Sequence, residues 1–299
     1  MPHRKTLARR ALPLVLAAGL SPLAGLAGAG PASADTVVRA TYEDGRLDSG
    51  YPGIRLDGCC AHSLTLDANL TRTGKGSLRS RLKYGDPQAA GGPRAESEAV
   101  GLTPARFRPG DRFWYGFSVY IPSTWQDDTV EDIVFQWHHT KSSCDDPNRS
   151  PAMFLVVMPP TSTAPSRLRL RVNSDPVLCD HRDHASAHLL KTSHDLVPLT
   201  KGVWHDLVLR VEWAHTATGS LRAWHRTDKS SGWTQVLAAE GVANTYHDDP
   251  ATFGYLQWGI YKPAWRTGPS AVPERNVWHD NVAVAPDSPT GMQDVDPSS

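Results

Sequence analysis

The chain has 299 residues, with 31 basic and 31 acidic side chains and four cysteines. This balanced charge excludes nucleic-acid binding through the overall field of the protein, because such binding needs an excess of basic groups. After the N-terminal apolar run no stretch is long and apolar enough to span a bilayer, and the length allows one domain with a sizeable core.

The first residues have the order of a secretory signal peptide. A basic start, MPHRKTLARR, precedes an apolar run from Ala11 to Leu26 and a small-residue cleavage pattern, AGPASAD. A membrane anchor is the alternative, but Pro22 and the cleavage pattern favour a signal over residues 1–34 and a secreted mature protein. The signal carries four basic and no acidic residues, so the mature chain has 27 basic against 31 acidic side chains, a net charge of −4.

Short segments of alternating polarity, separated by Gly, Pro, Asp and Asn, dominate the rest of the chain. They are rich in Val, Ile and aromatic residues, which predicts β-strands: RFWYGFSVYIP, IVFQWH, MFLVVMP, RLRLRV, WHDLVLRVEW, YLQWGIYK and VWHDNVAVA. Long helical periodicity is absent. We predict an all-β fold over residues 35–285, a β-jelly-roll sandwich of two antiparallel sheets with a concave groove. The polar residues 286–299 are expected to form a flexible tail.

Three of the expected strands carry polar side chains in phase. Because side chains alternate along a strand, each set points to one face: Arg94, Glu96 and Glu98; Gln136 and His138; Tyr255, Gln257 and Tyr261. Phe135 and Trp137 take the opposite face of their strand, which predicts core packing. Gly259 leaves room for a close approach to the backbone. If the three strands lie in one sheet, they form a polar surface that holds Arg, Gln, His and Tyr together.

This set of side chains suits the removal of a proton next to a carboxylate. Arginine binds a carboxylate with two parallel hydrogen bonds, glutamine adds an amide donor, and histidine and tyrosine move protons. Stabilising the charge that develops on the carboxylate makes the proton acidic enough to leave. The chemistry that follows is β-elimination on a uronic acid.

Two other functions are compatible with a sandwich of this kind. A carbohydrate-binding module would have the groove without the chemistry and would not require His138 or Tyr261. A glycoside hydrolase needs two carboxylates that flank one bond. Glu96 and Glu98 lie on one strand with α-carbons only ~6.6 Å apart, and they flank no evident cleft.

The order of these motifs resembles the β-jelly-roll polysaccharide lyases, in particular the glucuronan lyase and heparin lyase I-like group. The resemblance runs from about Thr41 to Ala285 through Arg-x-Glu, WYGFSVYIP, Gln-Trp-His, WHDLVLRVEW and YLQWGIY. The jelly-roll alginate lyases are a more distant likeness. Gln257 stands where those enzymes have lysine, and Lys262 and Pro263 follow Tyr261 where they have Asn-Gln.

The resemblance implies a role for each matching residue. Arg94 and Gln136 would neutralise the uronate carboxylate, and His138 would assist them or act as the base. Tyr261 would donate a proton to the leaving oxygen and is the other candidate for the base. The expected substrate contacts are Tyr255, Gln257, Glu96, Lys262 and Trp265, the last by stacking on a sugar ring.

Further expectations concern partners, metals and disulfides. The partner is an acidic polysaccharide, with glucuronan favoured and heparin-like glycans or alginate open; we expect a monomer with no nucleic-acid or membrane partner. The chemistry requires no cofactor, but Glu43 near the start and Asp280 near the end are candidates for a structural calcium site. Export favours disulfides, and we expect a Cys144–Cys179 bridge because both cysteines lie in polar, loop-like segments.

Overall fold

The structure is a computed structural model, and it describes residues 38–141, 150–179, 188–230 and 232–299. The expected signal peptide, residues 1–34, lies outside the described residues. Within the described ranges no helix has the length and apolar character needed to cross a membrane.

The described residues form two antiparallel sheets, which confirms the all-β jelly-roll prediction. One sheet has eight strands. In spatial order seven of them are β13 (Thr234–Val242), β12 (Gly219–Thr227), β11 (Trp204–Glu212), β6 (Arg112–Tyr120), β15 (Glu274–Pro286), β4 (Ser77–Lys83) and β3 (Leu64–Asp67), and β1 (Val38–Ala40) also pairs with β15. The pairing of β1 with β15 brings the two ends of the domain together.

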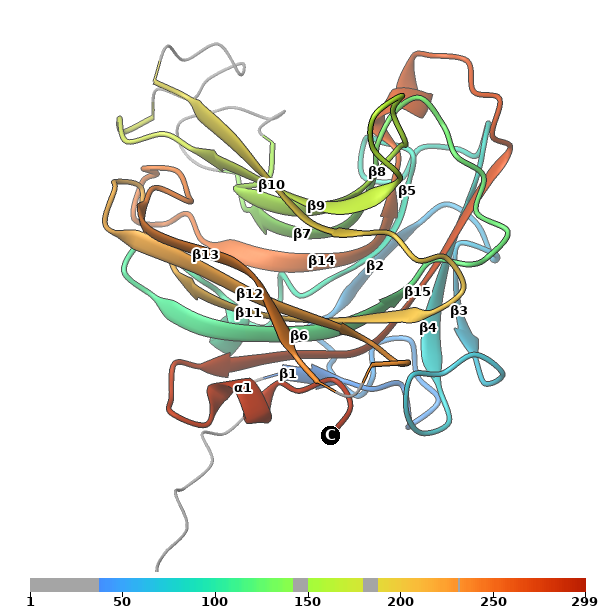
Figure 1. Cartoon of the computed structure of the whole chain (residues 1–299), viewed down its shortest axis with the longest axis horizontal. Helices are drawn as coiled ribbons and strands as arrows, with labels where there is room; N and C mark the ends of the chain where they lie inside the picture. Colours follow the sequence, from blue (N-terminus) through green and yellow to red (C-terminus); the bar gives the residue numbers. More distant parts are fainter. Residues whose placement is uncertain (1–37, 142–149, 180–187, 231) are drawn as a thin grey trace, which may run out of the picture. The chain divides into compact units, whose positions relative to one another are not determined.

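The second sheet has seven strands and carries the polar segments singled out above. In spatial order they are β10 (Leu190–Pro198), β9 (Arg167–Ser174), β8 (Met153–Met158), β7 (Asp132–His139), β14 (Gly254–Tyr261), β5 (Arg94–Glu98) and β2 (Arg55–Gly58). The remaining elements are short helices: η1 (Thr103–Ala105), η3 (Pro263–Arg266) and α1 (Gly291–Asp294). Figure 1 shows β7, β9 and β14 as a curved layer stacked on the layer that contains β6, β11 and β12.

The core lies between the two sheets and is built from the apolar phase of each strand. Phe117 of β6 stacks on Phe135 of β7 with ring centroids 4.0 Å apart, and Trp137 and Trp258 are fully buried beside them. Removal of such large aromatic side chains from water stabilises the sandwich and fixes the register of β7. Phe135 and Trp137 therefore face the core as predicted, and Gln136 faces away from it.

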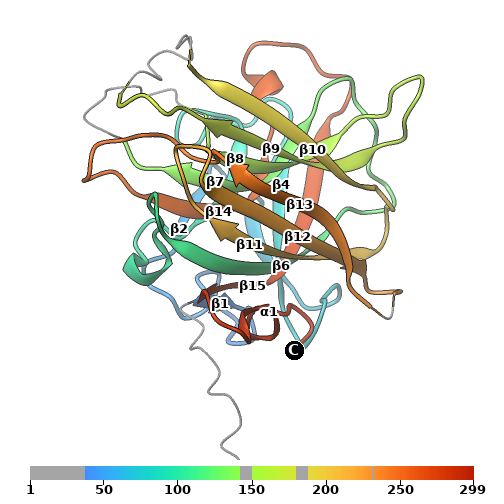
Figure 2. The same ribbon diagram turned by 60° about the vertical axis from the view of Figure 1, so that its left-hand side comes forward.

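The C-terminal residues pack on the eight-stranded sheet, so the prediction of a flexible tail from residue 286 is wrong. Figure 2 shows α1 beside β1 and β15, and Val295 is fully buried. Asp287 accepts two hydrogen bonds from Arg210, each of 2.8 Å, and Asp296 accepts one from Arg226. A few anchors of this kind order a segment whose composition is mostly polar.

A disulfide joins the adjacent residues Cys59 and Cys60 at the end of β2. The expected partner of Cys179, Cys144, lies outside the described residues, so the Cys144–Cys179 bridge stays a prediction.

Candidate active site

Strands β7, β14 and β5 are neighbours, so the three polar segments lie side by side on one sheet. Gln257 at the middle of β14 lies directly opposite Gln136 of β7 on one side and Glu98 of β5 on the other. Three further pairs follow along the strands: Tyr255 with His138, Gly259 with Glu96, and Tyr261 with Arg94. Residues that are directly opposite each other share a face, so the polar rows merge into one surface.

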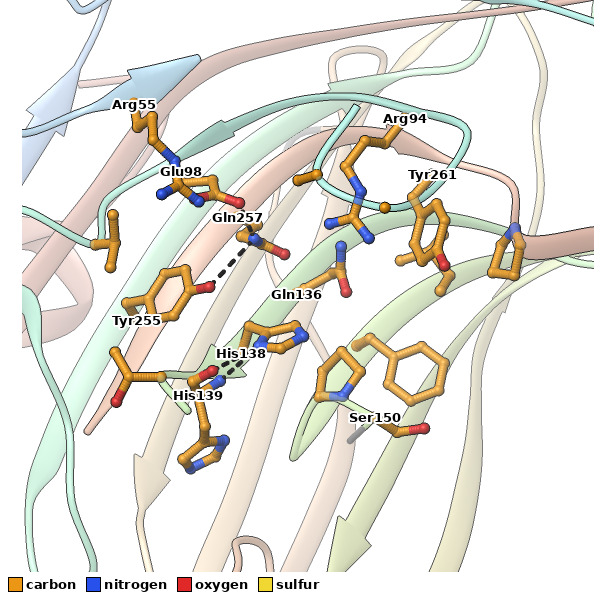
Figure 3. A pocket seen from close by; sticks show the side chains of 18 of the residues that line it. Arg55, Arg94, Glu98, Gln136, His138, His139, Ser150, Tyr255, Gln257 and Tyr261 are labelled. Carbon is orange, nitrogen blue, oxygen red and sulfur yellow. Dashed lines mark hydrogen bonds and ion pairs between the residues drawn. The ribbon is translucent and has the colours of Figure 1, made fainter. Parts of the chain in front are cut away.

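A cleft of about 670 Å³ lies over this surface. Its lining includes most of the predicted site residues: Arg94, Gln136, His138, Tyr255, Gln257 and Tyr261. Figure 3 shows Arg94 and Tyr261 next to each other, with Gln136 beside them and His138 on the far side of Gln136 near Tyr255. The sequence predictions for these residues therefore converge on one cavity.

Gly259 makes the tight pairing of β14 with β5 possible. Its φ is +144°, and a Cβ at this position would lie 2.2 Å from the carbonyl oxygen of Ala95. Only glycine fits that space and that backbone conformation. The residue thus sets how closely β5, which carries Arg94, approaches the strand that carries Tyr261.

Arg94 and Tyr261 form a close pair at one end of the cleft. The Arg94 guanidinium carbon lies 4.2 Å from the centre of the Tyr261 ring, within the range of a cation–π contact. Its Nη1 lies 3.3 Å from the carboxylate of Glu96, which is fully buried. Glu96 also accepts a hydrogen bond from Nε2 of Gln136. One buried carboxyl group thus holds the two side chains expected to bind the substrate carboxylate.

Glu96 itself lies below the cleft surface, so it orients Arg94 and Gln136 and is not placed to contact substrate as the sequence had suggested. Burial raises the pKa of the Glu96 carboxyl group, and the nearby Arg94 charge and the Gln136 hydrogen bond act in the opposite direction.

A second carboxyl group, Glu98, lines the cleft beside Arg55 of the edge strand, as Figure 3 shows. It accepts hydrogen bonds from Gln257 and from Arg55 of the edge strand β2. Burial, together with a side-chain hydrogen bond to Asp57 and the charge of Asp57, raises the pKa of Glu98 to about 8; Arg55 opposes this rise. Glu98 is therefore mostly protonated at neutral pH.

His138 lies at the other end of the cleft. Its Nδ1 is 2.8 Å from the backbone nitrogen of His139, which can donate a hydrogen bond to it, and also 2.8 Å from the backbone oxygen of His139, to which a protonated Nδ1 can donate. In the neutral tautomer that accepts the bond from the backbone nitrogen, the proton of the ring is on Nε2. The ring of His138 lies 5.8 Å from that of Tyr255, between centroids.

Two predicted substrate contacts lie outside the cleft. The side chain of Lys262 is fully buried, with Nζ 2.8 Å from Asp128 and 3.0 Å from Asp132. It follows Tyr261, and alternation along the strand turns it away from the cleft. Trp265 is also buried, and it packs edge to face against Tyr84 with centroids 5.5 Å apart. These placements correct the expectation that Lys262 and Trp265 touch substrate.

Two arginines that line the cleft were missed in the sequence. Arg55 is the first residue of a short strand, RLDG, that has no apolar alternation, so the sequence does not indicate that this strand pairs with β5. Arg266 lies at the end of η3, five residues after Tyr261, and its Nη2 donates a 3.1 Å hydrogen bond to the Tyr261 hydroxyl. Arg55 reaches the cleft through strand pairing between distant segments, and Arg266 reaches it through a helical turn. Alternation of side chains along a strand predicts neither feature.

Glu43 and Asp280, the candidate calcium ligands, are far apart in the sequence, but their carboxylates accept hydrogen bonds from the same loop. The carboxylate of Glu43 accepts backbone hydrogen bonds from Lys75 and Gly76, and Asp280 accepts one of 2.9 Å from Arg72. Burial raises the pKa of Asp280 to about 7, and the negative charge of Glu43 adds to the rise. Two carboxylates that repel each other beside one loop are oxygen donors of the type that calcium prefers.

The sandwich and the cleft define a jelly-roll protein with a polar cleft on one sheet, and family comparison gives its class. The chain belongs to the polysaccharide lyase family, whose model matches residues 42–283. It is an enzyme of that class. No curated protein matches the chain.

Solved structures agree on the fold. An endo-β-1,4-glucuronan lyase from the fungus Trichoderma reesei is 20% identical, with a TM-score of 0.65 over 83% of this chain and 96% of that one. An alginate lyase from Aplysia kurodai is 11% identical, with a TM-score of 0.53 over 85% of this chain and 100% of that one. At these identities the likeness concerns the jelly-roll architecture.

Proposed function

We propose that the protein is a secreted lyase that cleaves a uronic-acid-containing polysaccharide by β-elimination, with β-1,4-linked glucuronan as the favoured substrate. The observation that carries this proposal is the meeting of Arg94, Gln136 and Tyr261 in one cleft. A cation, an amide donor and a phenol are the groups that the elimination of a proton next to a carboxylate requires.

In this proposal Arg94 and Gln136 bind the carboxylate of the sugar that loses its C5 proton. The amide nitrogen of Gln136 carries two hydrogens, and one of them is engaged by Glu96. The second is then available to the substrate. Both interactions gain strength as negative charge develops on the carboxylate, which lowers the barrier to proton removal.

Tyr261 would act as both base and acid. In a β-1,4-linked glucuronate the C5 hydrogen and the C4 oxygen lie on the same side of the ring, so one group can serve both. The phenolate takes the C5 proton, the C5–H electron pair becomes the C4–C5 double bond, and the C4–O bond breaks. The departing oxygen takes a proton from the phenol, which restores the phenolate.

His138 is better suited to substrate binding than to the role of base. Gln136 lies between it and the Arg94–Tyr261 end of the cleft. In the tautomer that accepts the His139 backbone hydrogen bond, Nε2 of His138 carries the ring proton and can donate to a bound carboxylate or hydroxyl oxygen.

The choice of polymer rests on the cleft residues and on the motif likeness. Gln257 replaces the lysine of the alginate enzymes, and it donates to Glu98 instead of carrying a charge. This weakens the case for alginate and supports glucuronan, the substrate named for the Trichoderma enzyme that shares the fold.

Secretion, a monomeric state and a structural calcium ion complete the proposal. Secretion rests on the signal-like residues 1–34. Glu43 and Asp280 would hold the calcium ion, and its charge would relieve their mutual repulsion. The ion would stabilise the fold, and no step of the elimination involves it.

Ultraviolet absorbance tests the proposal directly. The C4–C5 double bond is conjugated to the carboxylate and absorbs, so the mature protein is incubated with glucuronan, alginate, heparin-like glycans and a neutral glucan. A rise in absorbance with glucuronan supports glucuronan as the substrate. A rise with another uronate polymer instead identifies that polymer as the substrate. A flat trace with every polymer, with the protein folded and polymer binding shown by gel retardation, would refute the proposed reaction.

A further inference from the structure

Arg266 occupies a defined position over the Tyr261 hydroxyl. It is the last residue of η3, which begins at Pro263, two residues after the end of β14, and places Arg266 in the lining of the cleft. Its Nη2 donates a hydrogen bond to the Tyr261 hydroxyl at 3.1 Å and another to the carbonyl oxygen of Gly91. These two bonds use both hydrogens of that nitrogen and fix the guanidinium next to the phenol oxygen.

The loop that contains Gly91 and Gly92 lies close against both Arg266 and Tyr261. A Cβ at Gly92 would lie 2.9 Å from Cε2 of Tyr261, 3.1 Å from Nη2 of Arg266 and 3.2 Å from the Tyr261 hydroxyl. Gly91, whose carbonyl holds Arg266, has a φ of +74°. Both positions therefore favour glycine, and the loop can lie against the phenol and the guanidinium without a side chain between them.

Of the two arginines that contact Tyr261, Arg266 is the one whose positive charge can stabilise a negative charge on the phenol oxygen. Arg94 also contacts Tyr261, but it lies over the ring face, and its charge is offset by the buried Glu96 at 3.3 Å. Among the described residues, Arg266 forms no ion pair with a carboxylate, and its hydrogen bond reaches the oxygen atom itself. A hydrogen bond from a cation to the oxygen favours the ionised form of that oxygen.

We infer that Arg266 is a positioning residue that orients the Tyr261 hydroxyl and stabilises the phenolate that attacks the C5 proton. Because the Tyr261 oxygen accepts from Arg266, the remaining lone pairs of the phenolate are directed to the cleft. After the elimination the same contact stabilises the phenolate that is regenerated when the leaving oxygen takes its proton. This inference rests on the proposed lyase function and adds a residue that activates its base.

The test compares Arg266→Met, Arg266→Lys and the wild type on the polymer that the wild type cleaves. A hydrogen bond to a charged group contributes enough that its loss should lower kcat at neutral pH by about tenfold to a hundredfold. The acidic limb of the kcat profile should move to higher pH by about one pH unit or more. Arg266→Lys should recover part of both effects, and KM should change less than kcat.

A second readout does not depend on turnover. The alkaline absorbance titration of each protein, minus that of the same protein with Tyr261→Phe, reports ionisation of this tyrosine alone. Its midpoint should move to higher pH in Arg266→Met. The matched control is Arg112→Met, an arginine with a half-exposed side chain that pairs with Glu212 on the eight-stranded sheet; it should leave kcat and the titration unchanged.

The outcomes separate this inference from the proposed function. An active wild type with an unshifted profile and titration in Arg266→Met would overturn the role of Arg266 and leave the lyase reaction intact. A rise in KM alone would make Arg266 a substrate-binding group and overturn the inference as well. If no uronate polymer is cleaved by the wild type, the proposed function fails, and the titration still decides whether Arg266 stabilises the phenolate.

Discussion

Replacing Glu98 with glutamine should remove a pH dependence from the stability of the protein. The folded chain holds the Glu98 proton up to a pH of about 8, whereas the unfolded chain releases it near the ordinary value of 4.5. Between these values unfolding releases a proton, so rising pH favours the unfolded state. Stability from this group is complete at low pH and is lost as the pH rises to about 8.

The size of the effect follows from the width of that window. Each pH unit between the two pKa values changes the free energy of unfolding by about 1.4 kcal/mol, which gives about 5 kcal/mol at most across the window. Glutamine is neutral like the protonated acid: its carbonyl can accept from Gln257 and its amide can donate to Asp57, but the amide cannot accept from Arg55. The stability of Glu98→Gln relative to the wild type should therefore rise by a few kcal/mol between pH 5 and pH 8.

Chemical denaturation at pH 5, 6.5 and 8 measures this difference. The control is Glu240→Gln on β13, whose side chain is 59% exposed and pairs with Arg222 at the surface; it should leave the pH dependence unchanged. If Glu98→Gln and the wild type lose stability in parallel as the pH rises, another group holds the proton, and the assignment to Glu98 is wrong.

Three further predictions concern the site and its surroundings. Tyr261→Phe should abolish the rise in absorbance while gel retardation by the polymer persists; retained turnover would remove Tyr261 from the reaction. Lys262→Met should lower the free energy of unfolding by about 3 kcal/mol or more, because it leaves Asp132 buried without one of its cations, and KM should not change; a KM effect without destabilisation would return Lys262 to the cleft. Calcium should raise the melting temperature of the wild type and not of Asp280→Asn; an equal response of both proteins would exclude this residue as a ligand.

Alternation along the strands accounts for most of what the sequence could predict. It assigned Phe135 and Trp137 to the core and Gln136 to the other face, and the structure agrees because burial of the aromatic pair fixes the phase of β7. The motif order then brought the three polar strands together. The same rule, applied strictly, would have predicted that Lys262 points into the interior, because it follows Tyr261, whose side chain faces the cleft.

Features that depend on pairing between distant segments could not be predicted. Arg55 reaches the cleft only because the short strand β2 pairs with β5, and its four residues carry no strand signal of their own. Arg266 reaches Tyr261 through a helical turn and a glycine loop that begins far earlier in the chain. The C-terminal segment is ordered by the buried Val295 and by ion pairs with Arg210 and Arg226, which lie 77 and 70 positions before their partners, and composition does not reveal such contacts.

The protonation state of Glu98 also affects how tightly the cleft binds a polyanionic substrate. At neutral pH the protonated acid leaves Asp57, at 3.4 Å, as the carboxylate that pairs with Arg55, whereas ionisation above about pH 8 adds a second negative charge beside this arginine. A substrate with a carboxylate on every sugar is then repelled, so KM of the wild type should rise through this pH range. In Glu98→Gln no charge appears, and KM should stay level. A parallel rise in both proteins would mean that the alkaline loss of binding comes from another group, because the variant has no acid at this position to ionise.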